Sequence, residues 1–189
     1  MRKGGATTLL LDRVLGELKQ IEPAVAAELV HVVDLDVAPC RVTCSRYCSR
    51  NPYQCAIDDD LAGTLDRMEK ADALLIGAPL YFRGPPAKFQ ALVERLVSLF
   101  FFQESQGEAV SPLRGKPCGL VAVAEYSNPH GVLEYLHDFS TVLKMRPVTL
   151  ERFPYLGVAG QGEVDRDRVF HPFERAAELA QALLSALEQ

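Results

Sequence analysis

Four cysteines lie within sixteen residues of this chain, in the stretch CRVTCSRYCSRNPYQC. They are Cys40, Cys44, Cys48 and Cys55. Four thiolates can hold a [4Fe–4S] cluster or a zinc ion, while cysteines that bind nothing pair as disulfides or pack as small apolar side chains. A helix over 40–48 would place the first three sulfurs roughly along one face, and the next loop would then bring Cys55 over them as a fourth ligand.

Cations accompany these cysteines: Arg41, Arg46 and Arg50 are interspersed, and no acid lies between Cys40 and Cys55. Positive charge stabilises thiolates and offsets the negative charge of a thiolate-ligated cluster. The sequence shows no secretory signal, so we expect a cytoplasmic address, where clustered cysteines indicate a metal or redox site rather than disulfides. Three interpretations stay open, namely an iron–sulfur cluster, zinc or a redox dithiol, and unligated cysteines.

Composition excludes several classes of function. The 189 residues are 48% apolar and 24% charged, which suits one soluble domain spanning 1–189. A net charge of −5 argues against a nucleic-acid partner. No apolar stretch reaches the roughly 20 residues that span a bilayer, so we expect no membrane partner. The fifth cysteine, Cys118, lies in an apolar stretch and is expected to be a buried structural thiol.

Helical and strand patterns alternate along the chain. Apolar residues at helical spacing predict helices over 9–18, 60–72 (with Asp60 as N-cap), 86–102, 132–145 and 171–187. Apolar, β-branched runs predict strands over 28–37, 73–82 and 116–128 and within 146–158. This alternation predicts a doubly wound parallel sheet covered by helices on both faces, in three layers α/β/α.

Ligands of such sheets lie beyond the carboxyl ends of the strands. The segment RKGGATT (2–8) offers glycines, hydroxyls and cations before a helix, which suits a phosphate site as well as a simple threonine-capped coil. In GAPLYFRGPP (77–86), Tyr81 and Phe82 follow a strand and offer either a flat wall for a planar ligand or two core aromatics. We expect His130 to be a solvated loop residue.

Three segments in this order carry a resemblance to a known family. They are RKGGATT before the first helix, the cysteine-rich loop ending in CAIDDDL (55–61), and GAPLYFRGPPAKFQALVER after a strand. The chain resembles the flavodoxin-like NADPH-dependent FMN reductases, in particular their iron–sulfur flavoprotein branch, over nearly its whole length. The cysteine motif of that branch is close to C-x-x-C-x-x-C, whereas each of the first two gaps here is one residue longer.

The resemblance implies an FMN site built from three loops. The residues that it assigns to the phosphate are Lys3, Gly4, Gly5, Ala6, Thr7 and Thr8. Those that it assigns to the isoalloxazine are Ala78, Pro79, Leu80, Tyr81 and Phe82. Those expected to close the other side are Ala124, Glu125, Tyr126, Ser127 and Asn128. No acid–base catalyst stands out, so none is assigned.

The resemblance also implies an FMN-dependent oxidoreductase that passes electrons between a reduced donor and an acceptor, each a small molecule or a protein. A [4Fe–4S] cluster on the four cysteines would relay single electrons, with a ferredoxin-like protein as donor. Without the cluster, the expected activity is that of an NAD(P)H-dependent FMN or quinone reductase. The alternatives are a non-catalytic flavodoxin-like electron carrier, a redox or metal sensor with zinc or free thiols at 40–55, and a zinc-stabilised scaffold.

Two further expectations concern the sheet and the assembly. The family begins with an apolar central strand, whereas this chain begins with MRKGG, so we expect the usual first strand to be missing and the true start to lie upstream of Met1. The apolar run LVSLFFFQ (96–103) fits the core or an oligomer interface. The resemblance implies a homodimer or homotetramer with FMN near that interface.

Overall fold

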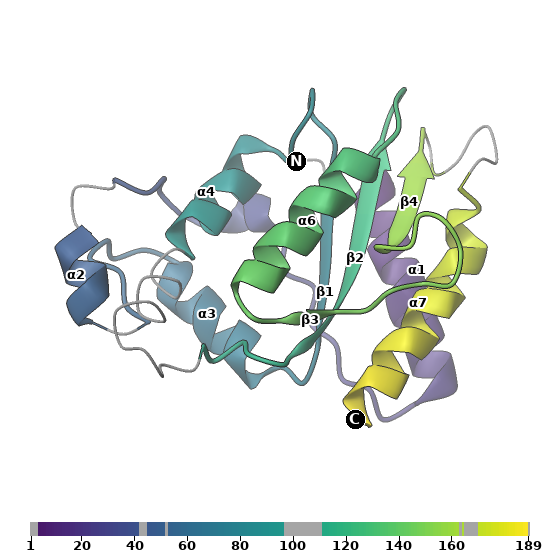
Figure 1. Ribbon diagram of the computed structural model, residues 1–189, viewed down its shortest axis with the longest axis horizontal. Helices are drawn as coiled ribbons and strands as arrows, with labels where there is room; N and C mark the ends of the chain where they lie inside the picture. Colours follow the sequence, from purple (N-terminus) through teal and green to yellow (C-terminus); the bar gives the residue numbers. More distant parts are fainter. Residues whose placement is uncertain are drawn as a thin grey trace.

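The structure is a computed structural model that describes residues 4–41, 45–51, 53–96, 111–162, 164 and 170–188. Its elements in chain order are α1 (Ala6–Ile21), the 3-10 helix η1 (Val32–Asp34), α2 (Ser45–Arg50), α3 (Leu61–Lys70), β1 (Leu74–Pro79), α4 (Ala87–Arg95), β2 (Pro117–Ala124), α6 (His130–Val142), β3 (Arg146–Pro147), β4 (Val158–Gln161) and α7 (Pro172–Leu187) (Figure 1).

β2 is the centre of an all-parallel sheet. β1 pairs with it from Leu74 opposite Cys118 to Pro79 opposite Val123. On the other side, β3 pairs with the beginning of β2 and β4 with its end. Within the described residues, no strand pairs with the outer edge of β1. The predicted parallel α/β sheet is therefore confirmed, and the expected first strand is missing from the part of the chain that is described.

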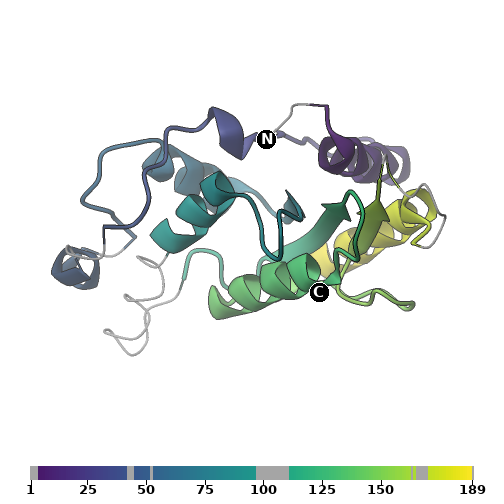
Figure 2. The same ribbon diagram turned by 90° about the horizontal axis from the view of Figure 1, so that it is seen from above.

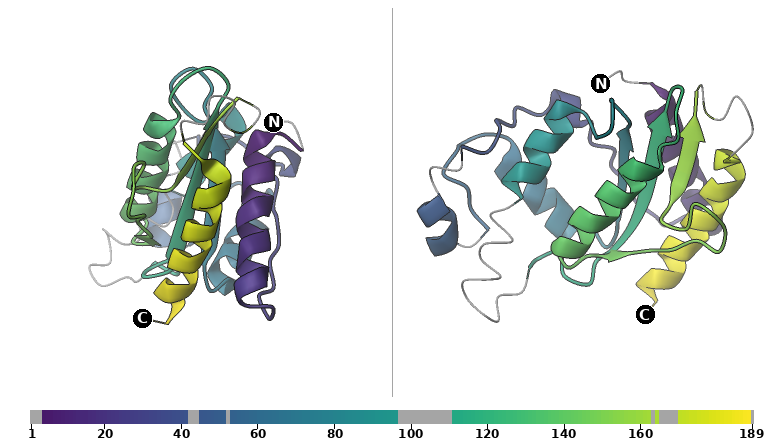
Figure 3. Two further views of the ribbon diagram at one scale, coloured as in Figure 1. Left: turned by 90° about the vertical axis from the view of Figure 1, so that its right-hand side faces the viewer. Right: turned by 45° about the horizontal axis from the view of Figure 1, so that its top comes forward.

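Alternate side chains of β2 point into two cores, as the two-residue period of a strand requires. On one face, Leu120 and Ala122 join a core cluster that includes Leu133 of α6. On the other face, Val121 and Val123 join a cluster formed with α1 and α7. Figures 2 and 3 show the resulting layers, with α6 on one side of the sheet and α1 and α7 on the other.

The prediction of a strand over 28–37 is wrong. This segment contains only η1, and the rest of it is irregular. Its backbone bonds to side chains instead of to a neighbouring strand: Lys88 Nζ donates to the carbonyls of Val33 at 3.3 Å and Leu35 at 2.9 Å. The amide of Asp36 donates to Asp60 Oδ2 at 2.7 Å. Because no described strand lies beyond β1, this segment has no ladder to join.

The predicted helices form close to their expected positions. α7 buries a stripe that includes Ala176, Leu179 and Leu183, at the spacing of one helix face. α4 begins after Pro86, whose fixed φ suits a helix start. The apolar run predicted for the core or an interface (96–103) lies outside the described residues from 97 onward, and its first residue, Leu96, is buried. No described helix has the length and apolarity that crossing a membrane requires.

The predicted last strand is divided into β3 and β4 by an excursion over 148–157. Arg175 of α7, which is 3% exposed, donates to the carbonyls of Arg152 at 2.7 Å and Phe153 at 2.8 Å. Glu178 of α7 accepts from the amide of Glu151 at 2.8 Å. Two side chains of one helix therefore hold the excursion against α7.

Gly157 ends this excursion with a φ of +154°, and a Cβ there would overlap the carbonyl oxygen of Leu120. We expect Gly157→Ala to lower the free energy of unfolding by about 3 kcal/mol or more, because backbone strain and overpacking add. Urea unfolding measures it. Gly131→Ala is the control: it lies in α6 with open space around it, so it should be neutral or stabilising by up to about 1 kcal/mol. Equal effects of the two changes would contradict the prediction.

Candidate functional site

The loops after β1 and β2 leave the sheet at the same end, because their strands are parallel and adjacent. The amide of Leu80 donates to Val123 O at 2.7 Å, which extends the pairing to the base of both loops. Figure 3 shows α1 beginning at this same end of the sheet. Three of the segments singled out from the sequence therefore converge here, at the end where ligands of doubly wound sheets bind.

The loop after β1 is a tight hairpin. Tyr81 and Gly84 exchange two backbone hydrogen bonds, with N–O distances of 2.9 and 3.2 Å. Phe82 occupies the first central position with a φ of +58°, where glycine is favoured. Holding a non-glycine residue in this conformation costs on the order of 1 kcal/mol. Tyr81 is 55% exposed and Phe82 is 102% exposed, so neither is a core aromatic.

The loop after β2 is equally open to solvent. Ala124 is buried at the end of the strand, and the next four residues are exposed, with Tyr126 at 84%. Asn128 Oδ1 accepts from the amide of His130 at 2.9 Å, which shapes the turn into α6. The two loops thus place exposed tyrosines above a buried strand end formed by Ala78 and Ala124. This arrangement fits a planar ligand that lies on the ends of the strands.

The N-terminus of α1 fits a phosphate group. The N-cap residue is Gly5, which has no side chain, and both threonines lie inside the helix. The alternative of an ordinary threonine cap is therefore wrong. The first amides of an α-helix lack intrahelical acceptors and can bind an anion. Gly4 has a φ of +75° and open space where a Cβ would lie. Thr7 is buried and Thr8 is partly exposed, while Lys3 lies outside the described residues.

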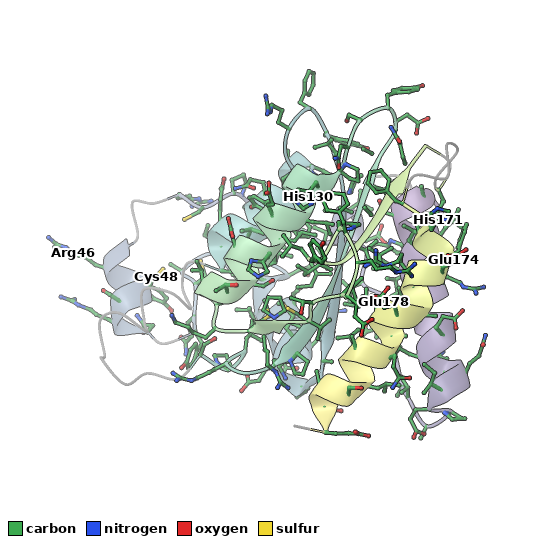
Figure 4. The ribbon with its side chains drawn as sticks, turned by 45° about the vertical axis from the view of Figure 1, so that its right-hand side comes forward. Arg46, Cys48, His130, His171, Glu174 and Glu178 are labelled. Carbon is green, nitrogen blue, oxygen red and sulfur yellow. The ribbon has the colours of Figure 1, made fainter. Side chains whose placement is uncertain are left out.

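The cysteines do not take the arrangement that a helix over 40–48 would give. The helix α2 begins only at residue 45, so it carries Cys48 but not Cys40, and Cys44 lies outside the described residues. Among the residues that are described, no three His, Cys, Asp or Glu side chains are grouped to hold a metal ion. Within this part of the chain, the predicted ligand set is therefore not assembled. Figure 4 shows Cys48 well away from His130 and the sheet.

A buried arginine organises the base of the cysteine loop. The side chain of Arg95, at the end of α4, is 0% exposed and pairs with Asp59 at 2.6 Å. Its guanidinium also donates to Ala38 O at 2.8 Å and Ile57 O at 3.4 Å. Its Nε donates to Cys55 Sγ at 3.2 Å. One side chain therefore links the two ends of the loop and contacts one of its cysteines.

Sequence reasoning did not find this role of Arg95, although a signal was present. Arg95 falls three residues after Leu92 and six after Phe89, both buried, so it lies on the apolar face of its helix. A charge on such a face indicates a buried partner. The acidic run after Cys55 supplies that partner in Asp59. Asp60 is the N-cap residue of α3, as expected, but its side chain makes no capping bond, because Asp60 Oδ2 accepts from the amide of Asp36. Asp59 Oδ1 accepts from the amide of Leu61 at 3.1 Å.

The pKa of Asp59 is lowered. Burial alone would raise it, but hydrogen bonds from Arg95, Ala38 and Leu61 and the guanidinium charge outweigh burial. Cys118 behaves in the opposite way, since burial raises its pKa to about 11 against a smaller lowering by Ser140. Cys118 is 0% exposed, which confirms the predicted buried thiol.

His130 is not the solvated loop residue that the sequence predicted. It is the first residue of α6, and its ring lies 5.2 Å from that of Phe153, centroid to centroid. Its Nε2 lies 3.5 Å from Glu134 Oε1. The excursion over 148–157 brings Phe153 to it, and nothing local in the sequence indicated this contact.

Asp59→Asn tests the network at the base of the cysteine loop. At neutral pH we expect it to lower the free energy of unfolding by about 3–5 kcal/mol, because it leaves Arg95 buried without a counter-charge. Since the folded-state pKa of Asp59 is lowered, its stabilisation is complete above the ordinary carboxyl pKa of about 4 and is lost as pH falls through the lowered value. The difference between wild type and variant should therefore shrink in acid. Urea unfolding at several pH values measures it.

Asp66→Asn is the matched control for Asp59→Asn. Asp66 pairs with Lys70 at 2.8 Å, but the two side chains are 57% and 74% exposed. Loss of this exposed ion pair should lower the free energy of unfolding by at most about 1 kcal/mol. A similar loss of unfolding free energy in both variants would contradict the assigned network. So would a stability difference between wild type and Asp59→Asn that does not change with pH.

Comparison with known proteins identifies the fold and the family. The solved structure of RosB with bound 8-demethyl-8-formylriboflavin-5'-phosphate superposes with a TM-score of 0.71 at 15% identity, covering 97% of this chain and 73% of that one. An azoreductase, AzrA, gives a TM-score of 0.61 at 12% identity, covering 99% and 94%. An NADH:FMN oxidoreductase gives 0.57 at 17% identity, covering 96% and 81%. The fold is that of the flavodoxin-like proteins.

Residues 1–153 match the family described as NADPH-dependent FMN reductase, and the chain belongs to this family. It is therefore an FMN-dependent oxidoreductase. An iron–sulfur flavoprotein of Methanocaldococcus jannaschii is 29% identical over 147 residues, or 76% of this chain and 69% of the relative. An iron–sulfur flavoprotein of Methanosarcina thermophila is 29% identical over 106 residues, and that match covers 53% of this chain and 54% of the relative.

Proposed function

We propose that the chain binds FMN at the carboxyl end of the β1–β2 pair and transfers electrons from NAD(P)H to an acceptor. The observation that carries this proposal is the convergence of three segments, the start of α1 and the loops after β1 and β2, at one end of the sheet. When bound, FMN supplies the hydride-accepting and electron-donating chemistry. The protein's own residues bind and orient it.

The phosphate would bind at Gly4, Gly5, Ala6, Thr7 and Thr8, with Lys3 as the cation. No side chain caps the first amides of α1, because the N-cap residue is Gly5, and this supports the assignment. The ring would lie on the strand ends at Ala78 and Ala124, between the loop of Pro79, Leu80, Tyr81 and Phe82 and the loop of Glu125, Tyr126, Ser127 and Asn128. The buried strand ends exclude water beneath the ring, and the loop backbones offer hydrogen-bonding groups at its edge.

The four cysteines support a second candidate function, a flavoprotein that also holds an iron–sulfur cluster. The similarity to two iron–sulfur flavoproteins favours it. The positions of Cys40, Cys48 and Cys55 do not, since the described residues form no metal-binding group. A cytoplasmic homodimer or homotetramer that takes electrons from a small molecule or a protein remains part of the proposal.

Ala6→Glu tests the phosphate position. A carboxylate in the first turn suits the helix dipole, so α1 itself should not be weakened. The same charge repels a phosphate, and we expect the Kd for FMN to rise at least about tenfold. The Kd for riboflavin, which lacks the phosphate, should change less than about twofold. Fluorescence titration with both flavins measures this. Gln20→Glu, at the exposed other end of α1, is the charge-matched control. An equal loss of both flavins would refute the assignment.

Anaerobic mixing of the FMN-loaded protein with NADPH or NADH tests the reaction. We expect the oxidised flavin absorption to disappear at about 1 s⁻¹ or faster, as in enzymatic turnover. Reduction by dithionite alone would instead identify an electron carrier. Iron and acid-labile sulfide are counted on the same sample. About four irons per chain would establish the cluster-containing alternative, and FMN without iron would leave the simple reductase.

A further inference from the structure

The buried guanidinium of Arg95 has an acceptor for each of its N–H donors. Nη1 donates to Ala38 O at 2.8 Å and to Asp59 Oδ2 at 2.6 Å. Nη2 donates to Ile57 O at 3.4 Å and to Asp59 Oδ1 at 3.2 Å. The remaining donor, Nε, is directed at the sulfur of Cys55, 3.2 Å away. Among these acceptors, the Cys55 sulfur is the nucleophile.

The contact with Arg95 favours the thiolate form of Cys55. The sulfur of a neutral thiol accepts hydrogen bonds weakly, whereas a thiolate forms a charge-assisted bond with a guanidinium. The Arg95 side chain is 0% exposed, so salt screens this attraction little. Asp59 shares the positive charge, but it binds through Nη1 and Nη2 and leaves Nε to the sulfur.

The guanidinium stays charged beside this sulfur. Burial by itself would lower the pKa of Arg95, but the hydrogen bonds and negative charges of Asp59 and Cys55 outweigh burial and raise that pKa. The cation therefore accompanies Cys55 throughout the pH range in which the protein is folded.

The other described cysteines differ from Cys55 in burial or in partner. Cys48 is 5% exposed and Cys118 is 0% exposed, and burial raises the pKa of Cys118 to about 11, so that its thiol stays protonated at neutral pH. Cys40 is partly exposed, like Cys55, but none of the hydrogen bonds among the described residues involves its sulfur. Of the cysteines that the structure describes, Cys55 thus combines access from solvent with a buried cation at its sulfur.

We propose that Cys55 is a site of reversible oxidation by hydroperoxides, with Arg95 holding its sulfur as the reactive thiolate. The sulfur attacks one oxygen of hydrogen peroxide, so an S–O bond forms and the O–O bond breaks. The sulfur loses two electrons and becomes a sulfenic acid, which thiols reduce again. The peroxide gains those electrons, and the hydroxide that leaves takes a proton from solvent and departs as water. This inference goes beyond the proposed reductase activity.

The test measures oxidation at each cysteine of the whole chain as purified, with FMN bound and no NAD(P)H added. The protein is mixed with hydrogen peroxide, the sulfenic acid is trapped with dimedone, and mass spectrometry of the peptides gives a rate for each thiol. We expect Cys55 to react about tenfold faster than Cys40, because thiolates and not thiols are the nucleophiles. Cys118 should stay unlabelled, and its labelling would indicate unfolding.

Arg95→Gln removes the cation and should slow Cys55 to within about twofold of Cys40. Lys88→Gln is the matched control, because Lys88 is a cation of the same helix that binds the carbonyls of Val33 and Leu35 instead of a sulfur. It should leave the rate at Cys55 unchanged. If Cys118 becomes labelled in Arg95→Gln, that variant has unfolded, and the wild-type ratio of Cys55 to Cys40 decides alone.

Three results would overturn the inference. They are a wild-type rate at Cys55 no higher than at Cys40, an unchanged rate at Cys55 in folded Arg95→Gln, and equal protection of the cysteines over 40–55, as a shared metal would give. Because no electron donor is added, a failure of the proposed reductase activity leaves this test unaffected.

Discussion

Burial of β2 on both faces is the constraint on which the rest of the molecule depends. All eight of its residues are buried, and it is the strand with which β1, β3 and β4 each pair. Its side chains alternate between the core under α6 and the core under α1 and α7. A one-residue shift in register would exchange those faces, so the packing fixes the register. The fixed register in turn fixes where the loops of the proposed flavin site emerge.

A second constraint, the buried pair of Arg95 and Asp59, acts outside the sheet. The described residues between 38 and 59, which include α2, lie outside the sheet, beyond α3 and α4 (Figure 1). Arg95 and Asp59 hold the two ends of this stretch, with both charges removed from water and most of their hydrogen-bonding groups satisfied. Such a pair defines geometry more than it adds stability, because desolvation offsets much of its attraction. The cysteine loop is thereby anchored to α4, the helix that directly follows the loop after β1.

The order and type of most elements were predictable, because helical and strand periodicities in this chain are strong and continuous. The buried strands β1 and β2 and the stripe on α7 follow directly from runs of apolar residues. The segment 28–37 was not predictable in this way. Its β-branched composition suits a strand, but a strand needs a neighbour, and the outer edge of β1 is paired with nothing in the described chain. A local sequence pattern does not show whether a partner strand is present.

The features of the candidate site also divide into those that local sequence pattern predicts and those that depend on tertiary contacts. By itself, the sequence determined which loops end strands, which residues carry the flavin-family motifs, and that Cys118 lies in an apolar strand, because these depend on local pattern and motif. Only the tertiary structure decided that Phe82 is strained and fully exposed, that Cys48 and Cys40 lie on different backbone elements, and that Arg95 contacts Asp59 and Cys55. These are contacts and conformations set by residues distant in sequence, whose energies no local spacing encodes.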